Sequence, residues 1–163
     1  MTVRPLTNEQ WGFTSNCFVC EPKNAAGLRI PFAHDDEAGV VRAEFTLDDR
    51  FSGAPTYLHG GVTLAVLDEA MAWATIAVGG KFAVTSETAT SFAHAVKVGR
   101  TYTVVATVDA RDDTTMQTSA TVSDDRGRTC VTARATFTIL ATAQVSDVIG
   151  VDDLGADSGY VND

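Results

Sequence analysis

The sequence predicts an α+β fold in which one antiparallel sheet surrounds a single long helix. Small and apolar residues fill positions 62–78 almost without interruption, a stretch too long for a buried strand. Six other segments alternate apolar and polar residues, which is typical of strands. Short, turn-like links join most of these segments, and such links favour antiparallel pairing.

The 163 residues, 45% of them hydrophobic and 20% charged, fit a single globular domain with an apolar core. We expect residues 1–26 to be irregular and residues 27–142 to form the domain. In residues 143–163 the periodicity stops and Asp, Gly and Ser dominate. This composition predicts an acidic, disordered tail.

Two strands are expected before the helix. Leu28, Ile30 and Phe32 begin the alternation, residues 35–39 form a turn, and residues 40–47 continue with the same period. The two segments should therefore pair as a hairpin, with a loop over residues 48–58.

The helix over residues 62–78 lies between two glycine pairs, Gly60-Gly61 and Gly79-Gly80, of which the second can form a left-handed stop. It is apolar on all sides, which predicts burial on most of them. It is shorter than the roughly 20 residues of a membrane span and carries Asp68 and Glu69 at its middle, so a transmembrane helix is excluded.

Four more strands follow the helix, and their short links predict that they pair antiparallel in sequence order. With the first hairpin they make a sheet of about six strands. The four segments are residues 83–92, 102–110, 116–123 and 129–140.

Charge and composition exclude several classes of function. The net charge is −9 with an isoelectric point near 4.6, and no basic stripe is present, which argues against a nucleic-acid partner. The first ten residues are polar and show no secretory signal, so we expect a cytoplasmic protein without a membrane partner.

Cys17 and Cys20 have the Cys-x-x-Cys spacing, but a closed zinc site needs four ligands and no second pair with suitable spacing exists. No strand-helix context of a thioredoxin-like motif surrounds them. We therefore interpret both, and Cys130, as reduced thiols, and expect neither a metal nor a cofactor.

Residues 58–70 carry the features with a chemical use. Backbone N–H groups of Gly60 and Gly61 at a helix N-terminus can receive the negative charge that develops on a carbonyl under attack, although a bare Gly-Gly pair more often forms only a tight turn. Asp68 is a costly acid in an apolar helix unless it is solvated or functional. Glu69 is about 100° further round, so the two acids cannot face the same pocket.

This motif, His-Gly-Gly with an acid nine positions after the histidine, on a long helix before four strands, resembles the hot-dog-fold acyl-CoA thioesterases of the phenylacetate-pathway type. The resemblance covers about residues 16–140, including the Asn-Cys-Phe-Val-Cys segment at 16–20 and Gly27-Leu28. It implies a sheet wrapped around the helix, and a homodimer or dimer of dimers whose active sites are built from both chains. Exposed sheet edges and a helix too apolar for one small sheet agree with that assembly.

By position, the resemblance implies that Asp68 is the catalytic acid, that Gly61 is the backbone oxyanion donor, and that His59 lies near the thioester. Asp68 would act as a general base on water or as a nucleophile forming a mixed anhydride. Thr85, with Ser86 as its substitute, would orient water from the partner subunit. Two alternatives stay open: His59 as a structural loop residue, and Thr85 as an ordinary strand residue.

The sequence offers several candidate substrate-binding residues and leaves two carriers of the acyl group open. The candidate substrate-binding residues are Gly60, Glu69, Trp73, Phe82, Ser86, Lys97 and Arg100, with Met71 a further candidate for the acyl pocket. The sequence departs from the family at Glu21, where glycine is usual, and at residues 93–95, where an arginine is usual. The substrate can therefore be an acyl-CoA or an acyl or polyketide chain on a carrier protein.

Two other functions fit part of this sequence. Hydratases with this fold carry an Asp and a His a few residues apart, and here the only such pair is His59 and Asp68. A non-catalytic protein that binds acyl thioesters remains an alternative, against which the combination of Asp68 and Gly60-Gly61 argues.

Overall fold

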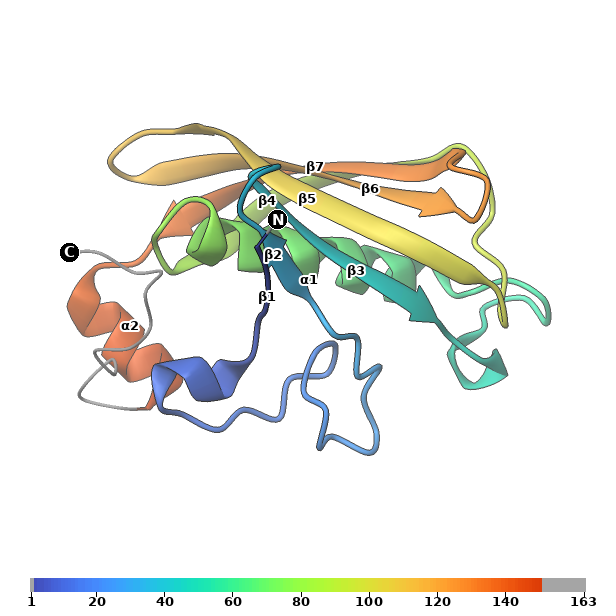
Figure 1. Ribbon diagram of the computed structural model, residues 1–163, viewed down its shortest axis with the longest axis horizontal. Coiled ribbons are helices and arrows are strands. Elements are labelled where there is room, and N and C mark those ends of the chain that lie inside the picture. Colours follow the sequence, from blue (N-terminus) through green and yellow to red (C-terminus); the bar gives the residue numbers. More distant parts are fainter. Residues whose placement is uncertain (1, 151–163) are drawn as a thin grey trace.

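The computed structural model describes residues 2–150, and one curved sheet covers one long helix (Figure 1). The predicted α+β class is confirmed, with seven strands among the described residues where the sequence suggested six. The elements in chain order are β1 (Val3–Pro5), the 3-10 turn η1 (Asn8–Trp11), β2 (Ala33–Asp35), β3 (Val40–Thr46), the 3-10 turn η2 (Asp49–Phe51), α1 (Gly60–Ala77), β4 (Ala83–Phe92), β5 (Thr101–Arg111), β6 (Thr115–Asp124), β7 (Thr129–Ile139) and α2 (Thr142–Ile149).

The strands lie in the order β1-β2-β3-β5-β6-β7-β4, and all neighbours are antiparallel. The prediction that strands after the helix pair in sequence order holds for β5, β6 and β7 and is wrong for β4, which pairs with β7. The helix carries the chain from β3 to the far edge of the sheet, and residues 93–100 return it to β5 beside β3. This link is a crossover and not a hairpin turn, because β4 and β5 are not neighbours in the sheet. Its end lies beside β3, where the N–H of Gly99 donates to the carbonyl of Leu47 at 2.7 Å.

Helix α1 begins two residues before the predicted start and ends one residue before the predicted end. Gly80 follows it with φ +72°, as expected of a left-handed stop. Gly79 has another role, because a Cβ there would lie 2.5 Å from the sulfur of Met116 on β6. The side of α1 that faces the sheet is fully buried, and its largest members include Val66, Leu67 and Met71.

The first predicted strand is mostly absent. Leu28, Ile30 and Phe32 are buried in alternation as expected, but Arg29 between them has φ +54°, which is incompatible with a regular strand. Only Ala33–Asp35 is a strand, and it forms the predicted hairpin with β3.

The two ends of the domain are more ordered than the sequence suggested. Residues 1–26 were expected to be irregular, yet β1 pairs with β2 at the edge of the sheet. Residues 142–149 form α2 with Val145 buried, where a structureless segment was expected. One buried side chain is too weak a pattern to predict a helix from sequence. The rest of the predicted tail lies outside the described residues. Within residues 2–150, no helix has the length and hydropathy needed to span a membrane.

Candidate active site

Asp68 on α1 and Thr85 on β4 form the central contact of the site. The Thr85 hydroxyl donates to Oδ1 of Asp68 at 2.7 Å, a short hydrogen bond to a carboxylate. Among residues 2–150, no group donates to the second oxygen, Oδ2. Thr85 was expected to reach the site from the partner subunit, whereas the structure pairs it with Asp68 of its own chain.

A β-bulge in β4 decides which hydroxyl faces the helix. Thr85 pairs with Phe137 of β7 and Glu87 pairs with Thr136, so Ser86 is the extra residue between them. The Ser86 hydroxyl lies 2.8 Å from that of Thr138 and donates to the carbonyl of Thr136 at 3.2 Å. Bulges often redirect a side chain beside a functional site. Here the bulge directs Thr85 to Asp68, and Ser86 has separate partners on β7.

The N-terminus of α1 is capped by His59. Its Nδ1 accepts from the N–H of Gly61 at 2.9 Å, which fixes the proton of a neutral ring on Nε2. Its carbonyl accepts from the N–H groups of Val62 and Thr63. Gly61, the predicted oxyanion donor, is thus bound to His59 in this structure. Within the described chain, the N–H of Gly60 has no acceptor.

Gly61 and Asp68 lie on the same side of α1. Seven residues turn a helix by about 700°, within about 20° of two full turns, and separate the two by about 10 Å along the axis. The ring of Phe92, at the end of β4, would lie 3.8 Å from a Cβ on Gly60, and it is 51% exposed. One row of groups therefore runs along the side of α1 that faces the free edge of β4, and it consists of the glycine pair, Asp68 and Thr85.

This side of α1 is incompletely covered within the single chain. Four apolar residues around Asp68 remain partly exposed, in contrast to the buried face under the sheet: Leu64, Ala65, Ala72 and Ile76. An apolar stripe next to a carboxylate suits an acyl chain or the surface of a second protein chain.

Glu69 points away from this row, as its rotation of about 100° predicts. Its Oε1 lies 3.3 Å from the sulfur of Cys17, and burial raises the pKa of Glu69 to about 8. Glu69 therefore faces the N-terminal segment and lies apart from the predicted substrate site.

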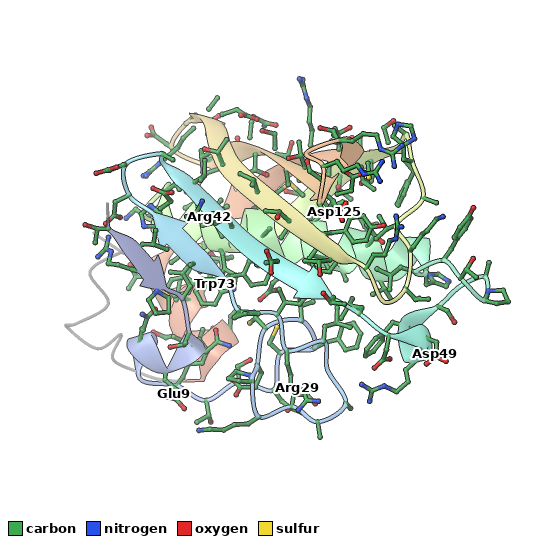
Figure 2. All side chains as sticks on the ribbon, turned by 45° about the vertical axis from the view of Figure 1, so that its right-hand side comes forward. Glu9, Arg29, Arg42, Asp49, Trp73 and Asp125 are labelled. Atoms are coloured by element: carbon green, nitrogen blue, oxygen red, sulfur yellow. The ribbon has the colours of Figure 1, made fainter. Side chains whose placement is uncertain are left out.

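Two predicted lining residues are enclosed in the core. Trp73 is 3% exposed and lies about 140° round the helix from Asp68. It is inside the molecule in Figure 2, whereas the labelled Arg29 reaches the surface of the N-terminal segment. Met71 is fully buried, and only Phe82, just before β4, keeps part of its surface exposed.

The predicted phosphate-binding residues lie on the crossover between β4 and β5. Lys97 forms an isolated bridge with Tyr57, two residues before His59, so its backbone runs beside the entrance to α1. Arg100 immediately precedes Thr101, which pairs with Thr46 at the end of β3. Both Lys97 and Arg100 are exposed.

A separate hollow of about 480 Å³ lies on the sheet, and no residue of α1 lines it. Its lining comes from β4, β6 and β7, is mostly small, and includes Arg134. Neither Asp68 nor Thr85 belongs to it, so it is distinct from the candidate active site.

Comparison with known families agrees with this fold. The sequence model of the thioesterase superfamily matches residues 56–131, from the loop before α1 to the start of β7. A solved thioesterase superfamily protein is 25% identical with a TM-score of 0.72, and the match covers 80% of this chain and 64% of that one. This chain thus spans less than two thirds of that protein's length.

Two further solved structures share the fold. The PaaI protein of the phenylacetic acid degradation operon of E. coli is 21% identical with a TM-score of 0.63, over 70% of this chain and 81% of that one. A Streptococcus mutans protein bound to acetyl-CoA is 20% identical with a TM-score of 0.60, over 63% and 82%. No curated protein matches the sequence significantly. The predicted resemblance to hot-dog thioesterases, and the hot-dog fold itself, are confirmed.

Proposed function

We propose that this chain, a hot-dog protein similar to the thioesterase superfamily, hydrolyses an acyl thioester to a free acid and a thiol. The observation that carries the proposal is the Thr85–Asp68 hydrogen bond on the open side of α1, in line with the Gly60-Gly61 terminus. A carboxylate held by a hydroxyl and facing an uncovered stripe is placed to act on a ligand. A purely structural acid would be paired inside the fold.

In the proposed reaction, Thr85 fixes the Asp68 carboxylate through Oδ1, and Oδ2 takes a proton from a water molecule. The water oxygen attacks the carbonyl carbon, and the carbon–sulfur bond then breaks. The proton held by Asp68 passes to the leaving thiolate, which leaves a free acid and a thiol. In the alternative route, Asp68 attacks the carbon itself and water hydrolyses the mixed anhydride.

The oxyanion of the tetrahedral intermediate would bind at the N-terminus of α1, where the helix dipole and free N–H groups favour negative charge. The N–H of Gly61 can serve only after the His59 ring turns away from it, because Nδ1 of His59 accepts this hydrogen bond in the structure. Gly60 is already open to a ligand. We therefore expect His59 to move when substrate binds.

Coenzyme A is the proposed carrier of the acyl group. Lys97 lies beside the loop that enters α1, where it can meet a phosphate of CoA. The similar Streptococcus mutans protein is bound to acetyl-CoA. A carrier-protein thioester is the alternative, since residues 93–95 carry no arginine.

We further propose that the active form is a homodimer or a dimer of dimers. Strand β4 is a ten-residue edge strand, with Val84 43% exposed and Phe92 51% exposed. A long, exposed edge with apolar side chains is a template for pairing with another chain. A second copy across this edge would also cover the partly exposed stripe of α1 and complete a closed acyl pocket.

The test is hydrolysis of short, long and aromatic acyl-CoAs and the matching acyl-pantetheines and acyl-carrier proteins, followed with a free-thiol reagent. Turnover of an acyl-CoA at least a thousandfold above the buffer rate supports the proposal. Turnover of the carrier-protein substrates alone would replace CoA as the carrier. Binding without turnover of any substrate would overturn the enzyme assignment in favour of a binding protein.

A further inference from the structure

Three side chains that can ligate a metal, and that the proposed reaction does not use, converge about 100° round α1 from Asp68. Cys17 and Cys20 come from the N-terminal segment, and Glu69 comes from the helix. Their ligand atoms all lie within 4.8 Å of one another, and the sulfur of Cys17 is 3.3 Å from Oε1 of Glu69.

Backbone pairing holds the cysteine segment in place. The N–H groups of Leu28 and Ile30 donate to the carbonyls of Phe18 and Val19, each at 2.8 Å. A Cβ on Gly27 would lie 2.6 Å from the carbonyl oxygen of Phe18, so this close approach requires glycine. The two sulfurs are therefore fixed against α1 by the fold.

The immediate contacts of the cluster suit a cation. The N–H groups of Val19 and Cys20 both donate to the sulfur of Cys17 at 3.4 Å. Among residues 2–150, no lysine or arginine pairs with the Glu69 carboxyl. A cation bound between the three side chains would compensate the negative charge of two thiolates and a carboxylate.

We propose that Cys17, Cys20 and Glu69 form a zinc-binding site, with water as the fourth ligand. Tetrahedral zinc with bonds of about 2.3 Å to sulfur and about 2.1 Å to oxygen places ligand sulfur and oxygen roughly 3.6 Å apart, and two sulfurs roughly 3.8 Å apart. The observed sulfur–oxygen distance of 3.3 Å is close to that value. Thiolate ligands select zinc over magnesium or calcium.

The rival interpretation is a pair of thiols that forms a Cys17–Cys20 disulfide. It accounts for the spacing of the cysteines and leaves a partly buried carboxyl beside them without a role. The zinc site accounts for all three groups. The sequence argued against zinc because no second pair of ligands is visible in it, and the third ligand lies on a helix far along the chain.

The experiment uses the untagged full chain, reduced, stripped with a chelator and titrated with Co²⁺ and then Zn²⁺. We expect one equivalent of Co²⁺, a thiolate-to-cobalt absorption band, and displacement by Zn²⁺. Cys17→Ser and Cys20→Ser should abolish the band, and Glu69→Gln should weaken binding at least tenfold. Cys130→Ser, which alters the buried thiol of β7, should bind as the native chain does. No band, an unchanged band in Cys17→Ser, or unchanged affinity in Glu69→Gln would overturn the proposal.

A second measurement needs no variant and so does not depend on the folding of one. Zn²⁺ should slow labelling of two of the three native thiols by a disulfide reagent at least tenfold and raise the Tm. Equal labelling rates with and without Zn²⁺ would overturn the site. Asp68→Asn should bind Zn²⁺ like the native chain, so this test is independent of thioester hydrolysis.

Discussion

Removing the Thr85 hydroxyl should reduce turnover without unfolding the protein. Thr85→Ala deletes the 2.7 Å hydrogen bond to Asp68 and leaves the carboxylate without its only partner among the described residues. A hydrogen bond to a charged group contributes about 1.5–3 kcal/mol, equivalent to roughly 10- to 150-fold in rate. Thr85 is exposed, so water can replace part of this interaction, and we expect the lower end of the range, about tenfold in kcat.

The assay is steady-state hydrolysis of the best acyl-CoA, with kcat and KM measured separately. Thr85→Ser keeps the hydroxyl and should retain kcat within about threefold, because serine loses only the rotamer restriction of a β-branched residue. Thr88→Ala is the matched control, since Thr88 pairs with Ala135 as Thr85 pairs with Phe137 and so lies on the same face of β4. If Thr85→Ala lowers kcat no more than Thr88→Ala does, Thr85 does not position Asp68.

Three further predictions concern the helix terminus, the assembly and a turn. Gly61→Ala should keep or raise the Tm, because alanine is a better helix former than glycine. It should also lower kcat/KM at least tenfold, because the new Cβ would lie 3.2 Å from Nδ1 of His59, where the thioester must approach. Unchanged kcat/KM would remove Gly61 from the site. Sedimentation equilibrium should give at least twice the 17.2 kDa of one chain, and a monomer with full activity would contradict the dimer. The N–H groups of Thr114 and Thr115 hold the pKa of Asp112 at about 2, below its ordinary 3.8. The ionised Asp112 therefore stabilises the folded protein above pH 3.8, and this stabilisation is lost as the pH falls through about 2. Asp112→Ala should therefore lower the Tm at pH 7 and have little effect below pH 2, and equal Tm values at pH 7 would refute this.

The local patterns of this sequence predicted the elements of the fold better than their arrangement. Period-two alternation located β3, β5, β6 and β7 to within about a residue or two at each end, and the apolar run located α1. The position of β4 at the far edge was missed because the short link between β4 and β5 suggests a hairpin. The sequence does not show that the helix has already carried the chain to the other edge of the sheet. Arg29 ended the first expected strand through its backbone conformation, which no alternation of side chains encodes.

In the candidate site, too, the sequence predicted individual residues better than the contacts between them. Asp68 and the glycine pair follow from the motif, and the pairing of Asp68 with Thr85 of the same chain follows from the bulge at Ser86, which the sequence does not reveal. Trp73 was a poor candidate for the pocket because helix rotation places it about 140° from Asp68. The rotation of Glu69 away from Asp68 was predicted, and its contact with Cys17 was not, since it depends on the path of the N-terminal segment.

Replacing Asp68 with asparagine tests whether its carboxylate acts on the thioester. The amide keeps the shape of the side chain and can still accept from Thr85, so the variant should fold and associate as the native chain does. We expect kcat to fall about a thousandfold or more on the best substrate, in a protein of unchanged Tm and molecular mass. Turnover within about tenfold of the native chain would contradict it.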